Sequence, residues 1–432
     1  MPTARAPRLA LGLAACAFPV LCAAIPLGLS TLEHSQTVAA ALAPHVGLWS
    51  PVPQHFDIWN HVLGRLMLVL PVAEMATRLN LLSALCAAVA IGFWTRMGLG
   101  LVTLTRPATL ARMTEQSRWH EPVAVTGGVV MLALSRPFFA IATGPGGGGV
   151  ALILIAAWML AASALLQNSA AHRAALSLAA LAGLVTATCP SLGVLVLPPT
   201  LALWLWGLRK SARGALLMPL AFFVGLSPLL GVVLVGRGSQ ATFVGWWQAL
   251  TLAPLRQAVA SVDGGTWWAA AGDLADQIGV VGGLLAVVGL VVTALRQPGL
   301  AAVVLYILWA TLILTAGSVT PWALAAFAGI AVVPLVAGML HFAGKLGRAR
   351  LPATIALVII GAVAPLLSGG LTHWHRDGRV AARLLARAQW KILPRSEVDP
   401  GSRAMSLAFE YGRALGVRPD LRAPSTKRTQ RR

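Results

Sequence analysis

Long apolar runs separated by short polar segments recur along most of the chain. A membrane helix needs about 20 mostly apolar residues to cross a hydrocarbon core of about 30 Å, and most of the runs approach that length. The pattern predicts eleven membrane-spanning helices. They cover residues 9–30, 79–95, 123–143, 150–166, 174–187, 191–208, 215–235, 278–295, 300–316, 321–342 and 351–371. The fifth and sixth runs, on either side of Cys189 and Pro190, can also be read as one broken segment, because proline interrupts helices.

The amino-acid composition also indicates a membrane protein. Hydrophobic residues make up 57% of the sequence and charged residues 11%, which leaves too few polar groups for the surface of a water-soluble globule. We therefore expect an all-α polytopic integral membrane protein, with a transmembrane domain at residues 1–372 and a basic tail at residues 373–432. Within the tail, residues 380–393 have the pattern of an amphipathic helix that lies on a membrane surface.

Basic residues are unevenly divided between the two sides of the predicted helices. If the N-terminus is cytoplasmic, the loops on its side carry most of the Lys and Arg of the membrane domain, and the opposite loops carry most of its acids. Lys and Arg mark cytoplasmic flanks, so we expect a cytoplasmic N-terminus. Residues 9–30 should be a retained helix, because the apolar stretch exceeds the core of a secretory signal. Eleven spans place the tail outside the cytoplasm, whereas an even number would place it inside.

The formal net charge of +20 is partly due to the tail. Such a charge attracts anionic lipid headgroups, so membrane lipids are expected partners. Nucleic acid is not an expected partner, because the basic residues do not alternate with aromatic residues and no nucleic-acid-binding signature accompanies them.

The first extracytoplasmic loop, residues 31–78, is long and contains carboxylates, histidines and tryptophans, which are residue types common in binding and catalytic sites. Glu33 is a candidate base or metal-holding acid, although it could instead stabilise the positive N-terminal end of a helix that begins near Ser35. Asp57 is a candidate auxiliary carboxylate or a solvated loop acid. We therefore predict that the functional site lies in this loop.

No metal ligand set follows from the sequence. His34, His55 and His61 share the first loop, but their spacing matches no standard pattern, which favours hydrogen bonding at the level of the lipid headgroups. The four cysteines lie in or at the ends of apolar runs without CxxC spacing, so neither a disulfide framework nor a zinc site is expected.

Several short motifs follow one another in a fixed order along the chain. They are EHSQ at 33–36, LWSPVP at 48–53, GRLMLVLP at 64–71, RLNLLSA at 78–84, SRPFFAIAT at 135–143, GLSPLL at 225–230, GWWQALT at 245–251 and GVRPDL at 416–421. This order resembles the bacterial protein O-mannosyltransferase-like membrane family of the GT-C glycosyltransferase superfamily. The resemblance extends over nearly the whole chain.

The resemblance implies a GT-C-like fold with a catalytic carboxylate in the first external loop. It implies transfer of a sugar, mannose being one candidate, from a polyprenyl-phosphate carrier to a protein, lipid or glycan acceptor. The reaction would take place at the extracytoplasmic face of a bacterial inner membrane. A carboxylate can deprotonate the acceptor hydroxyl or hold a divalent cation beside it.

Placed on this chain, the resemblance implies roles for individual residues. Arg78 and Arg136 would contact the carrier phosphate, although each could instead snorkel to the headgroup level. Arg136 interrupts an apolar run, where an ionisable residue indicates a functional site. Apart from the resemblance, Trp246 and Trp247 are candidates to stack on a sugar or to belong to an interfacial aromatic belt, and His34 is a candidate substrate contact.

Two motifs differ from the family pattern, and they keep a second function open. EHSQ stands where the family reads D-S-G-E, and LWSPVP stands where it reads H-P-P-G-x-P. The alternative to a transferase is a catalytically inactive relative that binds or scaffolds lipid-linked glycans. A transporter ranks third, because nearly all predicted spans lack ionisable residues.

Overall fold

The computed structural model describes residues 5–24, 75–105, 117–143, 148–167, 172–188, 192–210, 216–235, 264–316, 323–346 and 349–367. These ranges contain helices and short turns, and no strand occurs within them. The helices are α1 (Arg5–Ala24), α4 (Met75–Thr105), α5 (Ser117–Ala133), α6 (Arg136–Thr143), α7 (Gly148–Gln167), α8 (His172–Thr188), α9 (Gly193–Lys210), α11 (Met218–Val235), α14 (Gly264–Arg296), α15 (Pro298–Ala316), α16 (Ala323–Gly344) and α17 (Arg350–Leu367). The all-α prediction is confirmed for these residues.

Three helices within the described ranges are long and apolar enough to cross a membrane, at Thr77–Val102, Gly149–Gln167 and Ile278–Arg296. Shorter apolar helices accompany them, for example Pro298–Leu314 and Gly329–Gly344. These features indicate a membrane protein, and the number of eleven spans stays a prediction.

Some boundaries differ from the prediction. The predicted run 123–143 is two helices, α5 and α6, because the chain breaks immediately before Arg136-Pro137. α8 ends at Thr188 and α9 begins at Gly193, so this pair consists of separate helices. α14 begins at Gly264, but the non-helical residue Gly279 (φ 69°, ψ 165°) divides it, and its apolar part, Ile278–Arg296, agrees with the predicted span 278–295.

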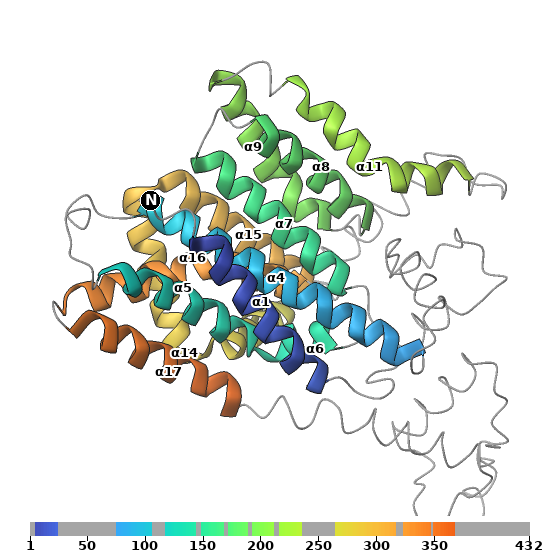
Figure 1. The fold of residues 1–432 in the computed structure, drawn as a ribbon. Helices are drawn as coiled ribbons and strands as arrows, with labels where there is room; N and C mark the ends of the chain where they lie inside the picture. Colours follow the sequence, from blue (N-terminus) through green and yellow to red (C-terminus); the bar gives the residue numbers. More distant parts are fainter. Residues whose placement is uncertain are drawn as a thin grey trace, which may run out of the picture.

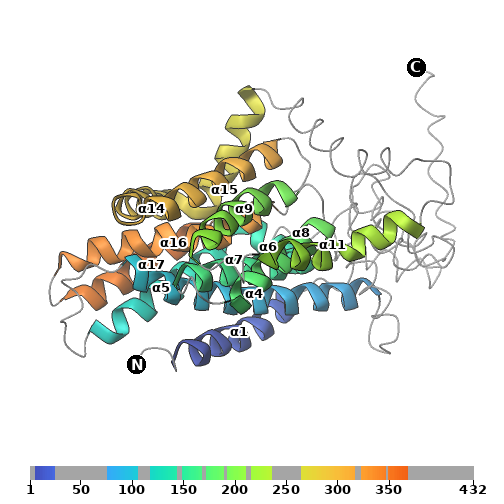
Figure 2. The same ribbon diagram turned by 90° about the horizontal axis from the view of Figure 1, so that it is seen from above.

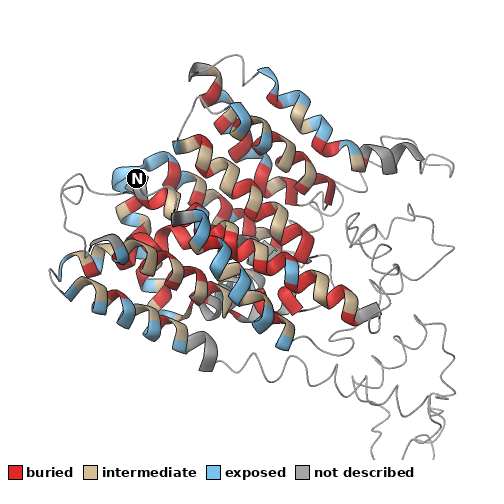
Figure 3. Ribbon diagram, in the orientation of Figure 1, coloured by how far each residue is buried: buried red, intermediate tan, exposed pale blue. Residues whose placement is uncertain are grey.

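The helices pack side by side in a layered bundle (Figure 1). α4 is central: α1 and α7 pack against it, and α5, α6 and α16 also contact it. Seen from above, α1 and α14 lie on opposite faces (Figure 2). Burial is concentrated along α4, α7 and α8, whereas α17 and α11 carry exposed faces (Figure 3).

Two hydrogen bonds join α9 to neighbouring helices. Trp158 on α7 donates its indole N–H to Thr200 Oγ1 on α9 at 2.9 Å, and the Tyr306 hydroxyl on α15 donates to the Val194 carbonyl oxygen on α9. Most buried Ser and Thr hydroxyls bond to carbonyls of their own helix, as Thr95 does to Ile91. Close packing of helix surfaces is the other contribution to association between membrane helices.

Glycines allow that packing at two helix pairs. Between α14 and α16, the Cα of Gly289 faces the Pro334 carbonyl oxygen, and the Cα of Gly338 faces the Leu285 carbonyl oxygen. The pair α8 and α11 repeats the arrangement, with Gly183 against the backbone of α11 and Gly225 against the backbone of α8. In each pair the backbones approach so closely that a side chain at either glycine would collide with a carbonyl group.

Gly338→Ala should therefore destabilise the protein. A Cβ at this position would overlap the Leu285 carbonyl oxygen, so α14 and α16 must separate, at a cost of roughly 1–3 kcal/mol. The unfolding temperature of the purified protein in detergent should fall. Gly283→Ala on α14 is the matched control, because a Cβ there meets nothing within 4 Å. An equal effect of both substitutions would contradict the packing argument.

Candidate functional site

The structure describes two of the residues predicted to form the site. Arg78 lies in the first turn of α4 with a half-buried side chain, and Arg136 is the first residue of α6, although its side chain is outside the described set. The other five candidates lie outside the described residues, so their roles stay predictions. They are Glu33, His34, Asp57, Trp246 and Trp247.

A buried polar stripe follows the start of α4 around Arg78. Thr77, Asn80 and Ser83 are 9%, 0% and 4% exposed, and their spacing places them on neighbouring turns of one helix face. α7 begins beside this stripe, because a Cβ on Gly149 would lie 2.8 Å from the Ser83 Cα. The RLNLLSA motif thus packs the beginning of α4 against α7 and fixes the position of Arg78.

A second candidate region is the interruption between α5 and α6. The Ser135 N–H donates to the Leu132 carbonyl oxygen at 3.1 Å, and the Ser135 carbonyl oxygen accepts the Phe139 N–H at 3.0 Å. The first bond closes a tighter turn than an α-helix, and the second starts the next helix. Pro137 has no backbone N–H to donate, so this segment begins a helix more easily than it continues one.

A buried hydroxyl lies in this interruption, and a buried tryptophan packs beside the helix that follows it. The Ser135 side chain is 1% exposed, and its hydroxyl has no partner among the described residues. Trp94 on α4 is 0% exposed, and its indole N–H likewise has no described partner. The Trp94 ring packs against Phe138 in the first turn of α6, with 5.4 Å between ring centroids. The sequence singled out Arg136 in this segment but not Ser135 or Trp94. A serine or a tryptophan within an apolar run does not reveal from sequence alone whether its side chain is buried in the protein.

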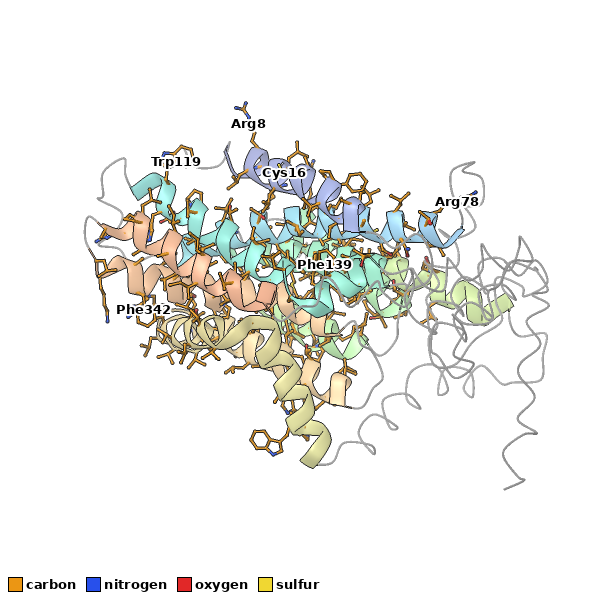
Figure 4. The ribbon with its side chains drawn as sticks, turned by 90° about the horizontal axis from the view of Figure 1, so that it is seen from below. Arg8, Cys16, Arg78, Trp119, Phe139 and Phe342 are labelled. Atoms are coloured by element: carbon orange, nitrogen blue, oxygen red, sulfur yellow. The ribbon has the colours of Figure 1, made fainter. Side chains whose placement is uncertain are left out.

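The two predicted phosphate contacts do not lie together. Phe138, two positions after Arg136, packs against Trp94, and Trp94 is separated from Arg78 by roughly 24 Å of helix at about 1.5 Å per residue. Figure 4 shows Arg78 at one end of the bundle and Phe139 of α6 near its middle. A single phosphate therefore does not bridge these two positions in this arrangement.

The end of the bundle opposite Arg78 is basic. Arg8, Trp119 and Phe342 lie toward that end (Figure 4). The helix termini that meet there carry further basic residues, which are Arg173 at the start of α8, Arg296 at the end of α14, Lys345 after α16 and Arg350 at the start of α17. All of these basic residues flank predicted spans on the side that the distribution of Lys and Arg predicts to be cytoplasmic.

A buried histidine lies at this basic end, before the predicted span 123–143. His120 is 8% exposed, and its Nε2 has no hydrogen-bond partner among the described residues. Burial lowers the pKa of His120, and the positive charge of Arg350 on α17 lowers it further. The neutral imidazole therefore fits the folded structure better than the imidazolium.

Acidification should destabilise the fold through His120. Below the ordinary pKa of 6.5, the unfolded chain takes up a proton that the folded chain resists, so the free energy of unfolding decreases as pH falls. The unfolding temperature should decrease between about pH 7.5 and 5.5, and His120→Gln should flatten this slope. His172→Gln changes an exposed histidine at the same end and should keep the slope. An unchanged slope in His120→Gln would exclude His120 as its source.

Within the ranges that the structure describes, no group of three or more His, Cys, Asp and Glu side chains gathers to hold a metal ion. The first loop, where a divalent cation is expected, lies outside those ranges. The chain matches no model of a known protein family and no curated protein sequence.

Proposed function

We propose that this protein is a membrane-embedded glycosyltransferase that uses a polyprenyl-phosphate sugar donor at the extracytoplasmic face of a bacterial inner membrane. The observation that carries the proposal is the ordered series of motifs from EHSQ to GVRPDL. The position of RLNLLSA supports it, because this motif starts α4 at the end of the bundle opposite the basic residues. With the basic end in the cytoplasm, Arg78 lies on the side where a first-loop carboxylate would act.

In the proposed reaction Glu33 removes the proton from an acceptor hydroxyl, and the acceptor oxygen attacks the anomeric carbon of the donor sugar. The bond between that carbon and the phosphate oxygen breaks, and the carrier phosphate leaves with the electron pair. Arg78 stabilises the negative charge of the leaving phosphate. Asp57 is the auxiliary carboxylate, and Trp246, Trp247 and His34 bind the sugar and acceptor.

The separation of the two arginines along α4 supports different tasks for them. Arg78 is at the end of the bundle, where a lipid phosphate resides, so we propose it as the donor contact. Arg136 lies deeper, at the start of α6 beside the buried Ser135 hydroxyl. We propose that Arg136 serves a second polar group of the substrates rather than the same phosphate.

Glu33→Gln should abolish most transfer. In a transfer assay with purified protein and a panel of polyprenyl-phosphate sugars, loss of a general base lowers the rate by about 10²–10⁴-fold. Arg78→Gln should also lower the rate, whereas Arg173→Gln, at the opposite end, should leave it unchanged. Equal turnover by wild type and Glu33→Gln would remove Glu33 from the mechanism. Absence of turnover with every donor would favour the inactive glycan-binding relative, which the altered EHSQ and LWSPVP motifs suggest.

The proposed topology is tested separately. With a cytoplasmic N-terminus and eleven spans, a reporter fused after Arg432 should be extracytoplasmic, so a fusion that is active only in the cytoplasm should be silent. The same reporter fused before Met1 should be active. Activity of both fusions would require an even number of spans.

A further inference from the structure

A glycine with a positive φ divides α14 into two parts of different character. Gly279 has φ 69° and ψ 165°, a backbone conformation that is essentially restricted to glycine. The apolar segment that begins there, Ile278–Arg296, has 19 residues, so it extends for roughly 28 Å and can cross the hydrocarbon core. Gly279 is therefore at the start of this span, at the membrane surface opposite to that of Arg296.

The part of α14 before Gly279, residues 264–278, leaves the bundle at this point. Figures 2 and 4 show it projecting from the remaining helices, at an angle to the part that follows. A straight helix of 33 residues would reach roughly 50 Å, which exceeds the hydrocarbon core by roughly 20 Å. The bend at Gly279 instead allows residues 264–278 to lie along the membrane surface.

Residues 264–278 have an amphipathic sequence. By helical spacing, one face is apolar and the opposite face is polar. The apolar face carries Trp267, Ala271, Leu274 and Ile278, and the polar face carries Asp273, Asp276 and Gln277. Such a pattern is typical of a helix that lies at the boundary between lipid and water. The segment contains two acids and no Lys or Arg, so attraction to anionic headgroups does not hold it there.

Trp268, which is next to the apolar face, indicates the surroundings of this helix. It is 81% exposed, whereas Trp267 is half-buried and Ile278 is buried. In water, an indole ring exposed to this degree would leave a large apolar surface uncovered. At the level of the lipid headgroups, the ring packs against acyl carbons while its N–H reaches polar acceptors, and tryptophan is enriched there for this reason.

We infer that residues 264–278 form an interfacial helix that binds the headgroup region of an uncharged phospholipid bilayer, with Trp268 as its anchor and Gly279 as the bend that joins it to the span. Burial of the indole ring and the apolar face stabilises the bound helix. Its position on the surface fixes the depth at which the span enters the membrane. Binding requires neither anionic lipid nor the proposed transfer reaction.

Site-specific photo-crosslinking tests the partner of this helix. p-Benzoylphenylalanine replaces Trp268 in the full-length protein, which is reconstituted into phosphatidylcholine liposomes and irradiated, and the adducts are identified by mass spectrometry. The label at this position should yield a phosphatidylcholine adduct, and the yield should be equal at low and high salt. The same label at Asp273, roughly 140° away around the helix, should yield little lipid adduct. At Val287, which is 62% exposed within the span, it should react with acyl chains.

Gly279→Ala tests the bend. A Cβ is strained at this positive φ, so residues 264–278 should reorient, and the label at position 268 should lose most of its lipid adduct. Gly283→Ala is the matched control, because a Cβ there meets nothing within 4 Å, and it should keep the adduct. An unchanged adduct in Gly279→Ala would overturn the role of the bend.

The comparison of positions 268 and 273 decides the question alone if Gly279→Ala yields too little folded protein. The proposal is overturned if the label at position 268 reacts chiefly with a second copy of the chain, or if it yields no more lipid adduct than the label at position 273.

Discussion

The close approach of glycine backbones holds this bundle together. In a lipid environment the exposed side chains and the solvent are equally apolar, so helices gain little by burying Leu or Val and associate through tight packing instead. The reciprocal contacts of Gly289 and Gly338 join α14 to α16, and those of Gly183 and Gly225 join α11 to α8. α14 lies on an outer face in Figure 2 and α11 at the edge of the bundle in Figure 1, and these contacts join them to α16 and α8.

The interruption between α5 and α6 departs from that regular packing. A backbone away from water must satisfy its hydrogen bonds within the protein, and here a short turn separates two helices instead of one continuous span. The buried Ser135 hydroxyl lies in this turn without a partner among the described residues, and the Trp94 ring packs against Phe138 in the first turn of α6.

The two ends of the bundle differ in the charged and polar residues that they carry. Helix termini carrying Arg173, Arg296, Lys345 and Arg350 gather at one end, whereas α4 begins with Arg78 above a buried polar stripe at the other. Basic residues at one end favour contact with anionic headgroups, and the other end is where we propose that the carrier phosphate binds.

The apolar periodicity of the sequence determined the all-α class and the approximate positions of the helices, because runs such as 150–166 and 300–316 are too apolar and too long for anything else. Of the candidate site, the sequence singled out Arg78 and Arg136 but could not show that they lie at different depths. Gly283 and Gly289 belong to the same helix and look alike in sequence, but the backbone of α16 leaves no room for a side chain at Gly289, whereas Gly283 faces open space. The depth of each arginine and the space beside each glycine depend on how the helices are placed relative to one another. The residue pattern within a single helix does not encode that placement, so only the tertiary structure decides it.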